Sequence, residues 1–166
     1  MLWDWGTLER IHHALYVATR EREGREHQWR KRHILVDTLG LLLNVVVHPA
    51  DVQDRDGARL VLDRRTRCLF PFIEYIFADA GYQGPRVTHA AASTGHWVVE
   101  IVKRNELHKF VVLPKRWIVE RTLAWISRNR RLARDFERYA RTVAAFVRLA
   151  MIRIMLRRLT RATHST

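Results

Sequence analysis

Cysteine, long apolar runs and several catalytic signatures are scarce or absent in this 166-residue sequence. Cys68 is the one cysteine, which excludes an internal disulfide and a cysteine-based zinc cluster. The longest apolar run, Leu41–Val47, is interrupted by Asn44 and is much shorter than a membrane span. No Gly-rich phosphate loop, HExxH or CxxC motif is present, so no nucleotide, metalloprotease or thiol-redox site of these kinds is indicated. The first ten residues lack the pattern of an export signal, so we expect a cytoplasmic protein.

Acidic residues are scarce in the C-terminal part of the chain. Residues 1–100 hold thirteen basic and thirteen acidic groups, whereas residues 101–166 hold seventeen basic and four acidic groups. The net charge of +13 therefore comes entirely from the second part. A one-sided basic segment on an otherwise neutral domain indicates a polyanionic partner, most simply nucleic acid. An anionic membrane surface would satisfy the same pattern, and composition does not separate the two.

Hydrophobic periodicity predicts one mixed α/β domain whose sheet lies between helices. Helices are expected over residues 7–23, 51–65, 85–94, 113–132 and 142–159. Strands are expected over residues 33–37, 41–47, 74–78, 97–102 and 110–113, with the first two forming a hairpin. Residues 24–32 are polar and basic without a period, which predicts a linker. A hydrophobic content of 48% and six tryptophans argue against disorder.

The segment Leu113–Leu132, LPKRWIVERTLAWISRNRRL, is predicted to form an amphipathic helix. Val119, Leu123 and Ile126 recur at helical spacing and form an apolar stripe. A separate polar face holds Arg116, Glu120, Ser127 and Arg131. One carboxylate among guanidinium groups suits a helix that holds a metal or a phosphate. The alternative is a solvated face with an ordinary Arg–Glu pair.

Asp79 directly follows the apolar run Glu74–Ala78 and precedes a loop with two glycines, Gly81 and Gly84. Ligand sites in open α/β sheets gather at the carboxyl ends of strands. Together with Glu120 on the later basic helix, Asp79 could supply oxygen ligands to two Mg²⁺ ions that clamp a phosphodiester. The alternative is that Asp79 only begins a turn, as Asp residues often do.

Four segments closely resemble insertion-sequence transposases of the DDE type, in particular the insertion-sequence-five group. They are KRHILVDTLGLLL, VHPADVQDRDGA, ADAGYQG and LPKRWIVERTLAWISRNRRLARDFE, and the likeness runs from about residue 30 to residue 158. The resemblance implies a ribonuclease-H-like fold in which two Asp and one Glu hold two Mg²⁺ ions for DNA nicking and strand transfer. Asp79 matches the second Asp, Glu120 matches the Glu, and Arg116 matches the family's arginine four positions before that Glu.

The sequence departs from this family in two places. Many relatives place a Lys seven residues after the Glu, where this chain has Ser127 followed by Arg128. The family segment similar to IDSQSVK, which carries the first Asp, has no counterpart, because residues 21–29 run directly into residues 30–37. An internal deletion is the simplest interpretation. We therefore expect a ribonuclease-H-like core without its first, central strand and an incomplete Mg²⁺ site, for which Asp37 is a weak substitute ligand.

These observations predict a division of the chain and leave three functions open. Residues 1–29 are interpreted as an N-terminal helix and linker left from an upstream region, and residues 30–166 as a DDE catalytic-type domain with basic C-terminal helices. The chain could be an active transposase with a recruited third carboxylate, or an inactive remnant that still binds DNA, which we favour. An unrelated basic RNA-binding or membrane-surface protein is disfavoured by the close match of these segments to the family and by the missing aromatic RNA-stacking signature.

The resemblance and the charge pattern together predict the partners. The expected DNA ligands are the element ends and the target, and a homo-oligomer is compatible with the resemblance. No membrane partner is expected. The residues predicted to contact DNA phosphates are Lys115, Arg121, Arg128, Arg130, Arg131 and Arg134.

Overall fold

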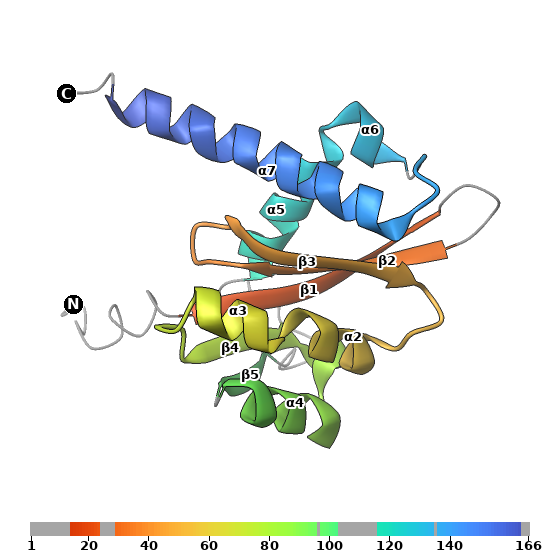
Figure 1. Cartoon of the computed structure of the whole chain (residues 1–166), viewed down its shortest axis with the longest axis vertical. Helices are drawn as coiled ribbons and strands as arrows, with labels where there is room; N and C mark the ends of the chain where they lie inside the picture. The colour runs from red at the N-terminus through yellow and green to blue at the C-terminus, as the bar shows by residue number, and fades with distance from the viewer. Residues whose placement is uncertain (1–13, 24–28, 96, 103–115, 135, 164–166) are drawn as a thin grey trace, which may run out of the picture.

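A five-stranded sheet in the order β3-β2-β1-β4-β5 forms the middle layer of the computed structural model (Figure 1). The structure describes residues 14–23, 29–95, 97–102, 116–134 and 136–163. The strands are β1 (Ala14–Glu23), β2 (Trp29–Val36), β3 (Leu42–Pro49), β4 (Tyr75–Asp79) and β5 (Val98–Val102). β1, β2 and β3 pair antiparallel, whereas β4 and β5 run parallel to β1. The sheet is therefore mixed, as the sequence predicts.

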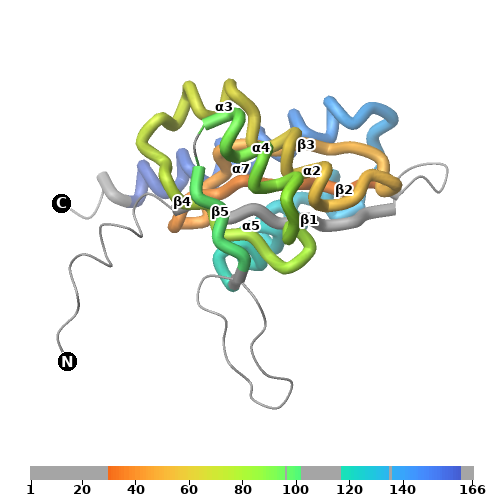
Figure 2. Tube along the Cα trace, turned by 90° about the horizontal axis from the view of Figure 1, so that it is seen from below, coloured from red at the N-terminus to blue at the C-terminus, as the bar shows by residue number. Residues whose placement is uncertain are grey.

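Helices cover both faces of the sheet (Figure 1). One face carries α2 (Asp54–Val61), α3 (Arg64–Leu69) and α4 (Pro85–Gly95), which lie in front of the strands in Figure 2. The other face carries α5 (Arg116–Ser127), α6 (Arg130–Ala133) and α7 (Ala140–Thr163). The 3₁₀ turn η2 (Ala80–Tyr82) follows β4 directly. None of the helices in the described part of the chain is long and apolar enough to cross a membrane.

Consecutive residues of β2 are buried in two different apolar clusters, as expected for a strand covered on both faces. Leu35 belongs to the cluster formed with α2 and α4. Ile34 and Val36, its neighbours, belong to the cluster formed with α5 and α7. Gly40, with a φ of 75°, lies in the turn that joins β2 to β3, where a residue with a side chain would be strained. The predicted hairpin is confirmed.

The strand β1 corrects two expectations. Residues 14–23 form a strand rather than the predicted helix, and residues 7–13 lie outside the described residues. β1 pairs with β2 on one side and with β4 on the other, so the sheet does not lack its central strand. Without it, β2 and β4 would each leave an edge of backbone N–H and C=O groups unpaired inside the domain, which is costly. Tyr16, Val17 and Thr19 are also residue types that favour strands.

Smaller differences concern the ends of elements. Residues 29–32, expected in a linker, belong to β2, so the predicted N-terminal segment shares a sheet with the predicted catalytic-type domain. The helix expected over residues 51–65 is divided into α2 and α3, because Asp63 caps a new helix by accepting from the N–H of Thr66. The long helix expected over residues 113–132 is interrupted between α5 and α6. The strand expected over residues 110–113 lies outside the described residues.

Candidate active site and nucleic-acid interface

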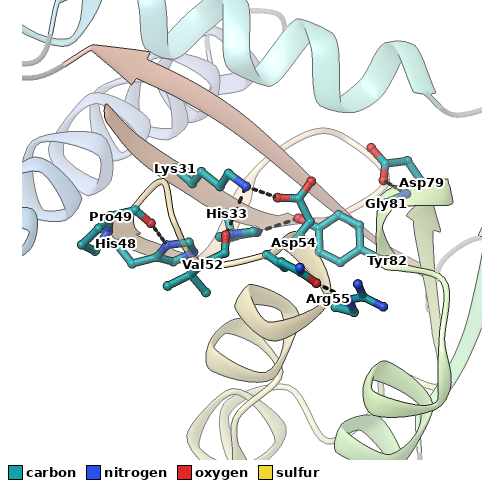
Figure 3. Close-up of polar contacts among 11 residues, drawn as sticks. Lys31, His33, His48, Pro49, Val52, Asp54, Arg55, Asp79, Gly81 and Tyr82 are labelled. Carbon is teal, nitrogen blue, oxygen red and sulfur yellow. Dashed lines mark hydrogen bonds and ion pairs between the residues drawn. The ribbon is translucent and has the colours of Figure 1, made fainter. Parts of the chain in front are cut away.

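Asp79 is the last residue of β4 and caps the turn η2. Its Oδ1 atom accepts a hydrogen bond from the N–H of Gly81 at 2.9 Å, so the turn-starting role is confirmed. Phe77, two residues earlier, packs against the apolar cluster of α5 and α7. Because side chains alternate along a strand, Asp79 belongs to the same sheet face. Its side chain is exposed there, at the end of the strand (Figure 3).

Glu120 lies on α5, the helix that packs on β1 from this same face. The predicted apolar stripe of that helix is confirmed, since Val119 is 7% exposed and Ile126 is 2% exposed. Glu120 is exposed, and Arg116 is the first residue of the helix. The fold therefore brings the two predicted carboxylate ligands to one face of the sheet, one on a strand end and one on the helix above the neighbouring strand.

The backbone register identifies the residue beside Asp79 on the central strand. Val17 of β1 pairs with Ala78 of β4, so the next position of β1, next to Asp79, is Ala18. The resemblance requires the first Asp of the triad on this central strand. Alanine offers no side-chain ligand atom, and the following residue is Thr19.

Asp54, the first residue of α2, is a carboxylate near Asp79 that no sequence pattern indicates as a site residue. A Cβ atom added at Gly81 would lie 3.1 Å from Oδ1 of Asp79 and 3.2 Å from Oδ2 of Asp54. Both carboxylates therefore border one glycine (Figure 3). Lys31 of β2 forms an ion pair with Asp54 at 3.2 Å and donates to the carbonyl of Val52 at 3.1 Å. Asp54 lies in the recognised segment VHPADVQDRDGA, but its nearness to Asp79 depends on tertiary packing.

The family model for the transposase DDE domain matches residues 6–155. The chain belongs to this family. It is 33% identical over 143 residues to a putative transposase for insertion sequence element IS402 of Burkholderia cepacia, covering 81% of this chain and 66% of that protein. The chain thus spans just under two thirds of that relative's length. The catalytic domain of the Mos1 mariner transposase superposes with a TM-score of 0.51 at 10% identity, over 88% of this chain and 80% of that one.

These comparisons confirm the resemblance at the level of the family, and the structural likeness shows the ribonuclease-H-like transposase fold. Assignment to the insertion-sequence-five group remains a prediction. The sheet order places β1 between the hairpin and the strand that carries Asp79, where the first strand of such a core belongs.

The described residues of this DDE domain do not fit a two-metal cage. Among them, no group of three His, Cys, Asp or Glu side chains is arranged to hold a metal ion. Asp54 pairs with Lys31, whose ammonium group would repel a cation. Asp37 lies at the β2–β3 turn, where its Oδ1 atom accepts hydrogen bonds from two backbone N–H groups at 2.9 and 2.8 Å. This carboxylate therefore stabilises the hairpin.

A buried histidine underlies this part of the transposase domain. His33 is fully buried, its Nδ1 lies 2.6 Å from the Tyr82 hydroxyl, and its ring stacks on His48 with centroids 4.6 Å apart (Figure 3). The pKa of His33 is lowered to about 4, mainly by burial and also by His48 and Lys31, while Asp54 acts in the opposite direction. His33 is therefore neutral at physiological pH. Tyr82, from the ADAGYQG segment, is a core residue.

The predicted DNA-binding arginines differ in how they contact the domain. The Arg121 guanidinium lies 4.3 Å from the Trp117 ring centre and 4.9 Å from that of Trp125. It also donates to the carbonyl of Leu39 at 2.8 Å. Partial burial and the nearby Arg158 lower the pKa of Arg121, although an arginine remains a cation at neutral pH. Arg121 is thus held by the protein itself.

Arg131 is also engaged, because its Nε donates to Glu137 at 2.6 Å and its guanidinium lies 4.6 Å from the Phe146 ring centre. The remaining predicted contacts within the described residues are exposed on α6 and its flanks; they are Arg128, Arg130 and Arg134. Lys115 lies outside the described residues. Three of the six predicted residues are therefore cations exposed to solvent.

Proposed function

We propose that this chain is a DDE transposase domain that binds DNA and has lost metal-dependent strand cleavage. The observation that carries the proposal is the register of the central strand, which places Ala18 beside Asp79 where the resemblance requires an Asp. Two hard cations need several oxygen ligands, and Asp79 with Glu120 supplies only part of such a set. Magnesium binding by the intact triad is therefore not expected for this chain. Membership of the transposase DDE family supports an origin in DNA transposition.

DNA binding is supported by the basic C-terminal part. Arg128, Arg130 and Arg134 are exposed on one short stretch of chain, which suits contacts to successive phosphates. Such contacts release condensed counterions, so log affinity should fall by roughly 0.9 per phosphate contact for each unit of log salt concentration. The DNA ligands we propose are the element ends and the target, and a homo-oligomeric assembly on them is part of the proposal.

Asp54 supports one alternative, an active enzyme with a recruited third carboxylate. Its Oδ2 borders the same glycine as Oδ1 of Asp79, so a modest movement could bring the two carboxylates into one site. This alternative requires Asp54 to exchange its ion pair with Lys31 for a metal. Breaking the ion pair would cost stability, so the inactive chain is the better-supported alternative.

The decisive experiment measures cleavage and binding on DNA that bears the element ends. In Mg²⁺ or Mn²⁺, the natural chain and the Asp79→Ala variant should nick the DNA equally little, while both bind it with an affinity that falls as salt is raised. Nicking by the natural chain above the Asp79→Ala background would overturn the loss of cleavage. Dependence of that nicking on Asp54, tested with Asp54→Asn, would establish the recruited ligand. An affinity that does not change between low and moderate salt would overturn the DNA-binding part.

A further inference from the structure

Two aromatic rings are exposed between α6 and α7, in the most basic part of the domain. Phe136 is 46% exposed and Tyr139 is 54% exposed, although both residue types usually bury most of their surface. They border a hollow of about 600 Å³, a volume within the usual range of ligand pockets. The lining residues are Arg130, Arg131, Phe136, Glu137, Arg138 and Tyr139.

The backbone between these rings is fixed from below by a buried arginine. Arg30 of β2 is 7% exposed, and its guanidinium donates to the carbonyls of Glu137 and Arg138, each at 2.6 Å. The Glu137 side chain is held in turn by Arg131 at 2.6 Å. These contacts anchor the short segment to the sheet through its carbonyl groups. Phe136 and Tyr139, at either end of the anchored pair, keep their rings at the surface.

The charge around the rings is strongly positive. The Arg141 guanidinium lies 5.3 Å from the Tyr139 ring centre, and that of Arg138 lies 5.8 Å from it. Residues 130–141 hold five arginines and two acidic residues, Asp135 and Glu137, and Glu137 is paired with Arg131. A ligand of this surface should therefore combine a flat apolar face with negative charge.

An unpaired nucleotide has that combination. In a duplex the base faces are covered by stacking, and only the edges and phosphates are open to a protein. A base outside the stack can lie on an aromatic ring while its phosphate contacts a guanidinium group. The two rings would add little to the binding of intact duplex and much to the binding of opened or single-stranded DNA.

We propose that Phe136 and Tyr139 form a stacking site for unpaired bases of DNA, with Arg130, Arg138 and Arg141 contacting the adjoining phosphates. The site rests on the proposed function, since it assigns the form of DNA that the basic C-terminal part recognises. A protein partner for the same rings is the competing explanation, because exposed aromatic and arginine residues also occur at protein interfaces. The excess of five arginines over two carboxylates in residues 130–141 favours a polyanion.

The test compares the affinities of the full chain for a short duplex, its single strand and the same duplex with an unpaired bulge. Phe136→Ala and Tyr139→Ala should each weaken binding to the single strand and to the bulge by roughly tenfold, and duplex binding by less than about twofold. Phe136→Trp and Tyr139→Trp keep a ring and should retain affinity. Leu156→Ala, at a residue that is 56% exposed on α7, is the matched control for loss of surface apolar area.

A spectroscopic signature separates stacking from a general effect on folding. A 2-aminopurine base at the unpaired position should lose fluorescence when the natural chain binds, and recover it in the double alanine variant. Equal thermal unfolding of the variants would show that the loop remains intact. Alanine variants that bind unpaired DNA like the natural chain would overturn the stacking site.

The other outcomes each have a distinct meaning. Duplex binding with no response to unpaired bases overturns this inference and leaves the proposed function standing. Absence of binding to every DNA overturns both. Tighter binding to RNA of the same sequence, or alanine variants that lose only self-association, would overturn the assignment to DNA.

Discussion

The Tyr82 hydroxyl and the Nδ1 atom of His33 lie 2.6 Å apart, joining the turn after Asp79 to the middle of β2. Both residues are almost fully buried, at 1% and 0% exposure. The two rings also meet edge to face, with centroids 5.9 Å apart. This contact holds the ADAGYQG turn against the sheet and so helps to position Asp79.

Tyr82→Phe removes the hydroxyl and keeps the ring. Losing a buried hydrogen bond of this kind should lower the free energy of unfolding by about 1–2 kcal/mol. Tyr139→Phe, whose ring is 54% exposed, is the matched control and should leave stability within about 0.5 kcal/mol. Urea unfolding followed by tryptophan fluorescence measures both. Equal stabilities of the two variants would show that the hydroxyl contact contributes nothing.

His33 should make stability depend on pH. Its folded pKa of about 4 lies below the ordinary value of 6.5, so between these values the unfolded chain binds a proton that the folded chain does not. Stability contributed by neutral His33 is complete above pH 6.5 and is lost as the pH falls toward 4. The full difference is roughly 3 kcal/mol.

The measurement is the free energy of unfolding across this pH range in the natural chain and in His33→Gln. Glutamine does not titrate, so the difference between the two chains isolates His33 from His48, Asp54 and Lys31, which surround it. Parallel pH profiles of the two chains would contradict the lowered pKa.

Gly57 of α2 lies directly under the His33 ring. A Cβ atom at this position would overlap the ring atoms Nε2 and Cε1, and the buried ring is packed against His48 and Tyr82. Gly57→Ala should therefore destabilise the domain by about 2–3 kcal/mol, although alanine favours helices. Gly95→Ala on α4 is the comparison at a less crowded position, because a Cβ atom there would lie 2.8 and 2.9 Å from Cδ and Cγ of Arg67 and 3.2 Å from Cε2 of Trp97. Its loss of stability in thermal unfolding should be smaller than that of Gly57→Ala. A mild effect at both positions would mean that the His33 ring can move.

The hairpin and α5 could be predicted from the sequence because their patterns are local. Two apolar runs around a short turn indicate β2 and β3, and the helical spacing of Val119 and Ile126 indicates the buried side of α5. β1 could not be predicted in the same way, because its residues match helical spacing and strand propensity alike. Its choice depends on pairing with β2, the next strand along the chain, and with β4, which is distant in sequence. The edges of both strands would otherwise be unpaired.

The candidate site, too, could be predicted only where the sequence pattern is local. Asp79 and Glu120 could be found because each lies in a recognisable segment. Asp54 could not, because its nearness to Asp79 arises where α2 meets the turn after β4, and no spacing in the sequence encodes it. Likewise, charge alone predicts Arg121 as a phosphate ligand, and only the packing of α5 reveals its tryptophan neighbours.

Arg121 and Arg128 should therefore respond oppositely to alanine substitution. Arg121→Ala removes two ring contacts and the hydrogen bond to the Leu39 carbonyl, which should cost about 1–2 kcal/mol of stability. Its effect on DNA affinity should stay below about twofold, because the guanidinium is already committed to the protein. Arg128→Ala removes an exposed cation, so stability should change by less than about 0.5 kcal/mol while the slope of log affinity against log salt falls by roughly one contact.

Both quantities can be measured on the same two variants, by urea unfolding and by DNA binding at several salt concentrations. The comparison is matched, because each variant loses one positive charge from the same basic stretch, so a uniform electrostatic effect would lower affinity equally. Equal losses of affinity would mean that net charge governs binding and that Arg121 can contact DNA despite its tryptophan contacts. A larger loss for Arg121→Ala would place the DNA on the tryptophan face of α5 instead of on α6.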